Sequence, residues 1–132
     1  MSVQNYRITS FGFLLAILTL NLGCATEPGL AEVVSSLNGN CPVMVDADTR
    51  LDAITTDGVH ELTYHFTLVS ASAHLLDTAE FRKAMWPGLL SNIRVSPEMQ
   101  KLRSQGVIIR YLYADRDGVP IGKFEFGDGH YR

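Results

Sequence analysis

Two cysteines are the residues of this sequence with the widest choice of chemistry. Cys24 follows Gly23 at the end of an apolar stretch, and Cys41 precedes Pro42. A thiol can carry an acyl chain, pair with a second thiol, or act as a nucleophile or redox group. Two cysteines in 132 residues are too few for a disulfide framework. We therefore treat lipid attachment at Cys24 and thiol chemistry at Cys41 as separate hypotheses.

Acidic residues after Cys41 raise the question of a calcium loop; they are Asp46, Asp48, Asp52 and Asp57. Such a loop needs oxygen ligands at alternating early positions and a glycine at its sixth position. Counted from Asp46, the fifth position is Arg50 and the sixth is Leu51. Because a guanidinium cannot share a coordination shell with a cation, no metal site is predicted. We expect Arg50 to pair with Asp46 or Asp52. The structural or binding cluster predicted here consists of Asp46, Thr49, Arg50 and Asp52.

Signatures of catalysis and of nucleotide binding are missing from the sequence. The histidines are scattered and lack the H-E-x-x-H spacing of zinc enzymes. Neither the G-x-S-x-G motif of a nucleophile elbow nor a glycine-rich phosphate-binding motif occurs. The net charge of -3, without a basic cluster, argues against a nucleic-acid partner. The sequence therefore predicts no catalytic residue, no cofactor and no metal, and it favours a protein without enzymatic activity.

The first residues have the layout of an export signal. Arg7 is the only charged residue before Glu27, and an apolar block runs from Phe11 to Leu20. This block is too short to span a bilayer, which takes about 20 residues of helix. Its end at Gly23 and Cys24 is similar to a bacterial lipoprotein signal. We predict a signal peptide over residues 1–23 and acyl chains such as palmitate on Cys24. The protein would then be held at a membrane of the cell envelope, facing the periplasm or the exterior.

Two alternatives remain open for this segment. Cleavage after Ala25 would release a soluble periplasmic or secreted protein, and an uncleaved segment would act as a retained anchor. Residues 24–37 are expected to form a tether or a short helix. The helical spacing that starts at Leu30 ends at the turn formed by Asn38 and Gly39.

Residues 38–132 are expected to form a single α+β domain, since 46% of the chain is apolar and 19% is charged. Strands are predicted at 49–54, 61–69, 107–114 and 119–126. The clearest is 61–69, in which Leu62, Tyr64 and Phe66 alternate with polar residues. Two helices separate the two pairs of strands. This order predicts two hairpins that join into a four-stranded antiparallel sheet (β-β-α-α-β-β), with both helices on one face.

Capping residues mark the ends of the two predicted helices. Asp77 is suited to the N-cap of the first helix, and Pro87-Gly88 is expected to kink or end it. Ser96 is the expected N-cap of the second helix, and Gly106 fits its C-terminal cap. Residues 127–129 are expected to close the domain as a turn.

Aromatic side chains provide the best candidate for an interaction surface. Tyr111, Tyr113, Phe124 and Phe126 lie on the last two predicted strands. Most of the aromatic rings are expected in the core, but strand alternation places some on the outer face of the sheet. Exposed rings there would bind a partner protein or an apolar ligand.

The segment from Asn38 to Asp52 carries a distinctive pattern: Asn38, Cys41-Pro42, Val45-Asp46 and Thr49-Arg50-Leu51. This pattern resembles the opening of a group of small exported bacterial proteins and lipoproteins to which no activity is attached. The resemblance extends through Asp77–Phe81 and the Tyr111–Tyr113 strand. It supports the domain boundaries given above.

Three functions are compatible with these observations. The favoured one is an envelope-attached, non-enzymatic lipoprotein that binds another envelope protein or a small ligand. The alternatives are a thiol-dependent or redox protein that uses Cys41, and a structural lipoprotein whose role is attachment itself. The export signal, the missing motifs and the aromatic strands favour the first.

Overall fold

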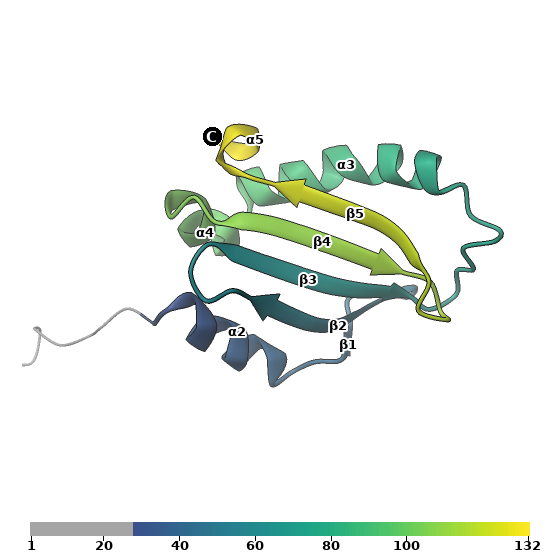
Figure 1. The fold of residues 1–132 in the computed structure, drawn as a ribbon, viewed down its shortest axis with the longest axis horizontal. Coiled ribbons are helices and arrows are strands. Elements are labelled where there is room, and N and C mark those ends of the chain that lie inside the picture. Colours follow the sequence, from purple (N-terminus) through teal and green to yellow (C-terminus); the bar gives the residue numbers. More distant parts are fainter. Residues whose placement is uncertain (1–27) are drawn as a thin grey trace, which may run out of the picture.

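The computed structural model describes residues 28–132, which form an α+β fold (Figure 1). The predicted signal peptide and Cys24 lie outside the described residues. The helices are α2 (Leu30–Asn38), α3 (Thr78–Val95), α4 (Gln100–Ser104), which follows a 3-10 turn at Pro97–Met99, and α5 (Asp128–Tyr131). The strands are β1 (Val43–Met44), β2 (Thr49–Thr56), β3 (Glu61–Leu68), β4 (Ile108–Ala114) and β5 (Pro120–Phe126).

The strands form one mixed sheet in the order β1-β2-β3-β4-β5. The two predicted hairpins are present, since β2 pairs with β3 and β4 pairs with β5, both antiparallel. The predicted four-stranded antiparallel sheet is wrong in two respects. The short strand β1 adds a fifth member, and β3 pairs with β4 in parallel, so that Leu62 lies opposite Ile109. The parallel pairing arises because α3 and α4 carry the chain back to the end of the sheet at which β3 begins.

One face of the sheet is lined with aromatic rings, and we call it the aromatic face. Its rings come from the three strands β3, β4 and β5: Tyr64, Phe66, Tyr111, Tyr113, Phe124 and Phe126. Neighbouring rings stack across the parallel pair, with centroids 5.2 Å apart for Tyr64 and Tyr111 and 5.0 Å apart for Phe66 and Tyr113. The period-two alternation of the strands places all six on the same side.

The helices pack against this aromatic face. Ile93 of α3 is fully buried in the cluster formed by the rings, and Val34 of α2 is buried against Ile54 and Leu62. Figure 1 shows α3 running beside β5 and α2 beside β2. The turn expected at residues 127–129 is instead the start of α5. Its Tyr131 is buried and donates a hydrogen bond of 2.6 Å to the carbonyl of Val107, which closes that end of the core.

Helix α3 begins where the sequence predicts but does not end there. The Asp77 carboxylate accepts hydrogen bonds of 3.0 Å from the backbone N–H groups of Ala79 and Glu80, as an N-cap does. The helix then continues through Pro87 to Val95. Pro87-Gly88 therefore does not end the helix, which was one of the two expectations for this pair. Both residues are exposed, and the apolar side of α3 packs on the sheet before and after them. This burial offsets the hydrogen bond that a proline removes.

Gly122 allows α3 to approach β5 closely. A Cβ atom at this position would lie 3.0 Å from Cε1 of Phe81 and 3.1 Å from Cε2 of Phe124. Both contacts are tighter than side chains normally make. The ring of Phe81 therefore occupies the space that a larger residue at position 122 would need.

Asn38 ties α2 to the edge of β2. Its side-chain amide donates a hydrogen bond of 2.6 Å to the carbonyl of Ile54, and its side-chain oxygen accepts one of 2.7 Å from the N–H of Ile54. Strand β1 covers only the part of β2 around Arg50 and Leu51. The Asn38 side chain therefore supplies at Ile54 the two hydrogen bonds that a neighbouring strand would otherwise make.

Replacing Asn38 by alanine should destabilise the protein by about 2 kcal/mol, because both backbone groups of a buried residue lose their partner. Urea unfolding followed by circular dichroism measures the change. Asn40→Ala is the matched control, since Asn40 is exposed and its backbone N–H makes its bond to Leu37. Equal stability of the two variants would contradict this role for Asn38.

Candidate functional site: a groove on the open face of the sheet

The face of the sheet opposite the aromatic face carries polar and charged side chains, and we call it the open face. It is formed by residues that alternate with the rings of the aromatic face: Glu61, Thr63, His65, Thr67, Arg110, Leu112, Lys123 and Glu125. The helices α2 to α5 all contribute to the clusters on the other side. The described residues therefore leave this polar face without a covering layer.

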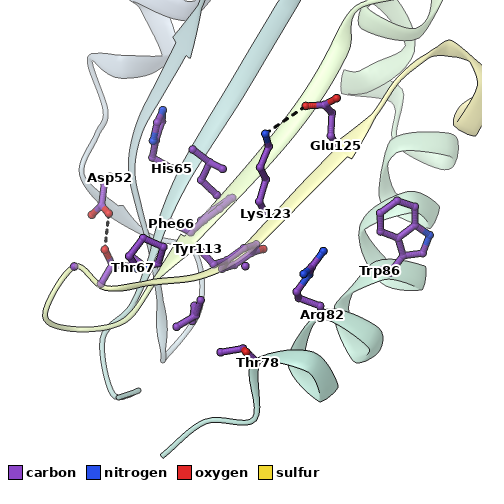
Figure 2. Close-up of a pocket in the computed structure, with 16 residues that line it drawn as sticks. Asp52, His65, Phe66, Thr67, Thr78, Arg82, Trp86, Tyr113, Lys123 and Glu125 are labelled. Carbon is purple, nitrogen blue, oxygen red and sulfur yellow. Dashed lines mark hydrogen bonds and ion pairs between the residues drawn. The ribbon is translucent and has the colours of Figure 1, made fainter. Parts of the chain in front are cut away.

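A groove of about 1070 Å³ crosses the open face from β2 to α3 (Figure 2). His65, Thr67 and Leu112 contribute to its floor, and Asp52 lies at the β2 side. The groove continues over β5, past Gly122 and Lys123, to the flank of α3. There it is lined by three residues one helical turn apart: Thr78, Arg82 and Trp86.

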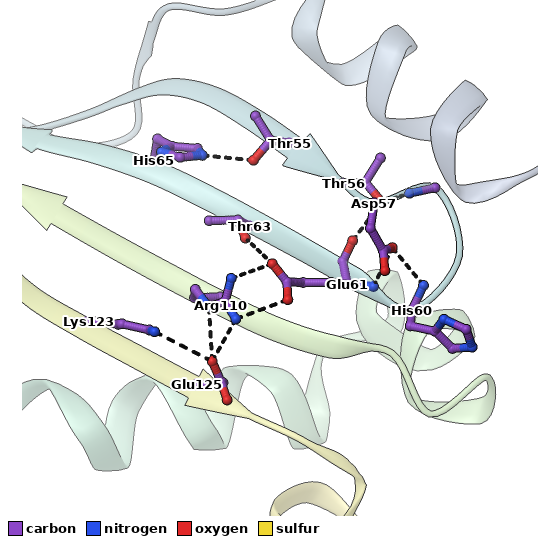
Figure 3. A network of polar contacts seen from close by, with 11 residues as sticks. Thr55, Thr56, Asp57, His60, Glu61, Thr63, His65, Arg110, Lys123 and Glu125 are labelled. Atoms are coloured by element: carbon purple, nitrogen blue, oxygen red, sulfur yellow. Dashed lines mark hydrogen bonds and ion pairs between the residues drawn. The ribbon is translucent and has the colours of Figure 1, made fainter.

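Ion pairs fix the charged side chains beside the groove (Figure 3). Arg110 on β4 bonds to Glu61 on β3 and, through Nη2, to Glu125 on β5 at 2.8 Å. Lys123 lies 3.8 Å from the same carboxylate. The hydrogen bond from Arg110 lowers the pKa of Glu125 below its usual value. The network joins three adjacent strands across the open face.

Asp52 and His65 are also engaged. The carboxylate of Asp52 accepts a hydrogen bond of 2.6 Å from the Thr67 hydroxyl and pairs with Arg50 Nε at 2.5 Å. Burial works to raise the pKa of Asp52, but these two partners outweigh it and hold the pKa below its usual value. Nε2 of His65 lies 2.8 Å from the Thr55 hydroxyl. These groups are held as formed pairs.

The flank of α3 differs from the rest of the groove. Arg82 is exposed and makes no hydrogen bond or ion pair with any residue of the described range 28–132. Trp86, four residues later, is 37% exposed although its ring centroid lies 4.5 Å from that of Phe126. Residues four apart lie on one side of a helix. A free guanidinium and a partly exposed indole thus stand side by side at the wall.

The structure separates the predicted structural or binding cluster into two groups. Asp46 accepts hydrogen bonds of 2.8 Å from the backbone N–H groups of Asp48 and Thr49, which forms the turn between β1 and β2. These bonds, first that from Asp48, lower the pKa of Asp46. Arg50 pairs with Asp52, one of the two expected partners, and only Asp52 of the cluster lines the groove.

Cys41 lies between α2 and β1, partly exposed and unpaired. Its Sγ lies 3.8 Å from the carbonyl of Leu37, and the residue does not line the groove. No histidine or acidic side chain is hydrogen-bonded to it within the part of the chain that the structure describes. Thiol chemistry at Cys41 stays a prediction.

The aromatic surface expected on β4 and β5 needs correction. Tyr111, Tyr113, Phe124 and Phe126 are all buried, with at most 6% of each residue exposed. The expectation that alternation turns some of them outward is wrong, because these four occupy one face of two paired strands and α3 covers that face. The partly exposed ring at the groove is instead that of Trp86, on α3 rather than on the two strands.

Arg82 and Lys123 were also missed. The sequence indicated this part of the groove only incompletely. Arg82 and Trp86 have the spacing of residues on one helix face, but the position of Lys123 on the strand beside that face follows from the tertiary fold. Across residues 28–132, no group of three histidine, cysteine, aspartate or glutamate side chains is arranged to hold a metal ion. Nor does any helix in this range have the length and apolarity needed to cross a bilayer.

Both the sequence and the fold of this chain are similar to those of known proteins. A family model described as "Domain of unknown function (DUF8479)" matches residues 28–119. A protein of Pseudomonas aeruginosa assigned as secreted has a similar structure, with a TM-score of 0.64 at 17% identity over 77% of this chain and 88% of that one. No curated protein matches the sequence.

Two further similar structures are pilotins of type 2 secretion systems. The pilotin EpsS of Vibrio vulnificus has a TM-score of 0.60 at 10% identity, over 76% of this chain and 86% of that one. The pilotin AspS of Vibrio cholerae has a TM-score of 0.55 at 10% identity, over 74% and 84%. At identities this low, the likeness establishes a common fold.

Proposed function

The chain belongs to the DUF8479 family of domains of unknown function, and from its groove we propose that it is a non-enzymatic binding module of the bacterial envelope. The groove on the open face would hold a segment of another envelope protein. The observation that carries this proposal is a groove of about 1070 Å³ on a sheet face that residues 28–132 leave uncovered. One wall of the groove carries a guanidinium without a partner in that range and a partly exposed indole.

The state of the polar groups favours binding over catalysis. A general acid needs a proton-donating group, and a general base a proton-accepting group, that is free to meet the substrate and has a pKa near the working pH. Asp52 and Glu125 are instead paired with arginines, and their pKa values are lowered away from neutrality. Such groups define a fixed pattern of charge, which suits recognition.

The similar structures support a place in the envelope. One is assigned as a secreted protein, and two are pilotins of type 2 secretion systems. We propose that this chain is attached through acyl chains on Cys24, which lies shortly before α2. Only five residues separate Cys24 from the start of α2 at Leu30. The domain would then stay within a short distance of the bilayer, where an envelope partner can be met.

Photocrosslinking in cells tests the proposed groove. We expect a photoreactive amino acid at Thr78 or Leu112 to give one adduct of defined mass, because both positions line the groove. The same amino acid at Ser35 or Ser104, which are exposed on other elements, serves as the control. Adducts are separated by electrophoresis and identified by mass spectrometry. Absence of adducts at the groove positions, or equal adducts at all four, would contradict the proposal.

A further inference from the structure

We propose that the α3 wall of the groove selects a partner segment in which an acidic side chain stands next to a large apolar one. Arg82, with Lys123 beside it, would pair with the carboxylate. Trp86 would contact the apolar side chain. This inference rests on the proposed function and specifies the chemistry of the partner.

The wall carries positive charge that the described residues 28–132 do not neutralise. Arg82 has no partner among residues 28–132. Lys83 lies 3.8 Å from Glu80, at the limit of an exposed ion pair. Lys123 is equally far from Glu125, whose carboxylate is already bonded to Arg110 at 2.8 Å. The nearby acids therefore leave a cationic excess at Arg82 and Lys123.

The opposite side of the groove carries no matching negative excess. Asp52 is paired with Arg50 and bonded to Thr67. The whole chain has a net charge of -3, so the positive wall is local. The local cationic wall attracts a single carboxylate, whereas the net negative charge of the rest of the chain repels a polyanion such as nucleic acid. Charge complementarity therefore points to an acidic side chain of a protein segment.

Trp86 adds the apolar half of the recognition. A second hollow of about 360 Å³ adjoins the wall and is lined by Ala79, Arg82, Lys83, Trp86, Lys123 and Phe124. It brings the indole, the ring of Phe124 and the methylene chains of the cationic residues together. Amphipathic side chains of this kind present apolar stems beside charged heads. A large aliphatic or aromatic side chain next to the acidic one would bury the exposed part of the indole.

Charge variants of Arg82 test this inference in the crosslinking assay with the photoreactive group at Thr78. Arg82→Gln should lower the adduct yield about tenfold, because one charge-assisted hydrogen bond is lost. Arg82→Glu should abolish the adduct, and Arg82→Lys should restore much of the yield. Arg116→Gln removes the same charge from an exposed residue that does not line the groove and should leave the yield unchanged. Circular dichroism checks that each variant is folded.

A displayed library of random 12-residue peptides, selected on the purified full-length protein, tests the partner chemistry directly. Peptides retained by the wild type should be enriched in aspartate or glutamate beside leucine, phenylalanine or tryptophan. Arg82→Glu should lose the acidic enrichment.

The two proposals fail in different ways. Wild-type adducts that persist unchanged in Arg82→Glu would overturn the inference while leaving the groove as a binding site. Absence of groove adducts in the wild type would overturn the proposed function itself. Selected peptides without acidic residues would also overturn the inference.

Discussion

Asp115→Ala is expected to lower the melting temperature by about 10 °C or more, because a buried carboxylate that accepts three backbone hydrogen bonds is removed. Only 1% of Asp115 is exposed. Its carboxylate accepts hydrogen bonds of 2.8 Å from the N–H of Ala73 and of 2.9 Å from those of Asp117 and Val119. Ala73 belongs to the segment between β3 and α3, whereas the other two lie in the turn between β4 and β5. One carboxylate therefore holds two distant segments together, and alanine leaves three N–H groups without an acceptor.

Differential scanning calorimetry at neutral pH measures the loss. Asp117→Ala is the matched control in the same turn, because its carboxylate is exposed and lies 3.7 Å from Arg116 in a weak pair. We expect it to melt within about 2 °C of the wild type. If Asp115→Ala melts as the control does, the carboxylate does not hold the two segments together.

The same carboxylate contributes to the acid limit of stability. Hydrogen bonds from backbone N–H groups, that from Ala73 first, hold the pKa of Asp115 below its usual value. A lowered folded-state pKa means that the contribution is fully present above the unfolded value of about 3.9 and is lost as the pH falls below it. Asp57, whose pKa is lowered to about 2 by the N–H groups of Val59, Glu61 and His60, acts in the same direction. Melting between pH 2 and 7 should therefore show a shallower acid limb in Asp115→Asn than in the wild type.

Cys24→Ser is expected to move the protein from the membrane fraction to the soluble fraction. This residue lies outside the described part of the chain, and its role follows from the proposed lipid attachment. Each buried methylene of an acyl chain contributes about 0.8 kcal/mol, so several chains on one cysteine give stable anchoring and their loss removes it. Fractionation after cell lysis, with the intact mass of the protein in each fraction, measures the change.

Cys41→Ser provides the control for Cys24→Ser, since it removes the other thiol and should leave the protein with the membranes. The intact mass separates the alternatives. A wild-type protein that begins after Ala25 and carries no lipid would contradict the attachment. A Cys24→Ser protein that stays with the membranes at the mass of the uncleaved chain would instead identify a retained anchor.

Local signals in the sequence predicted the elements better than their arrangement. Asp77 caps α3 and Gly106 follows α4 with a φ of 67°, because caps depend on a few neighbouring residues. Strand β3 was predictable because apolar and polar residues alternate from Leu62 to Leu68. Strand β1 has two residues and exposed side chains, so it offers no such pattern.

The parallel pair and the groove depend on contacts between distant parts of the chain. The neighbouring strands of two hairpins can pair in parallel or antiparallel. Here the packing of α3 on the sheet decides that β3 and β4 pair in parallel. Pro87 lies within α3 because its ring faces solvent and the buried residues around it hold the helix together. The groove wall contains Arg82 of α3 and Lys123 of β5. No periodicity in the sequence indicates that these two residues lie close together. The site was therefore less predictable than the fold.

The parallel pairing of β3 with β4 makes the last hairpin slow to join the sheet during folding. Leu62 and Ile109 are far apart in the sequence, and proteins with a high contact order fold slowly. Until residues 108–114 arrive, β3 presents a row of unpaired backbone groups along one side. Such a row can recruit the same row of another nascent chain. Aggregation is therefore expected during the interval before the last hairpin docks, rather than from the completed fold.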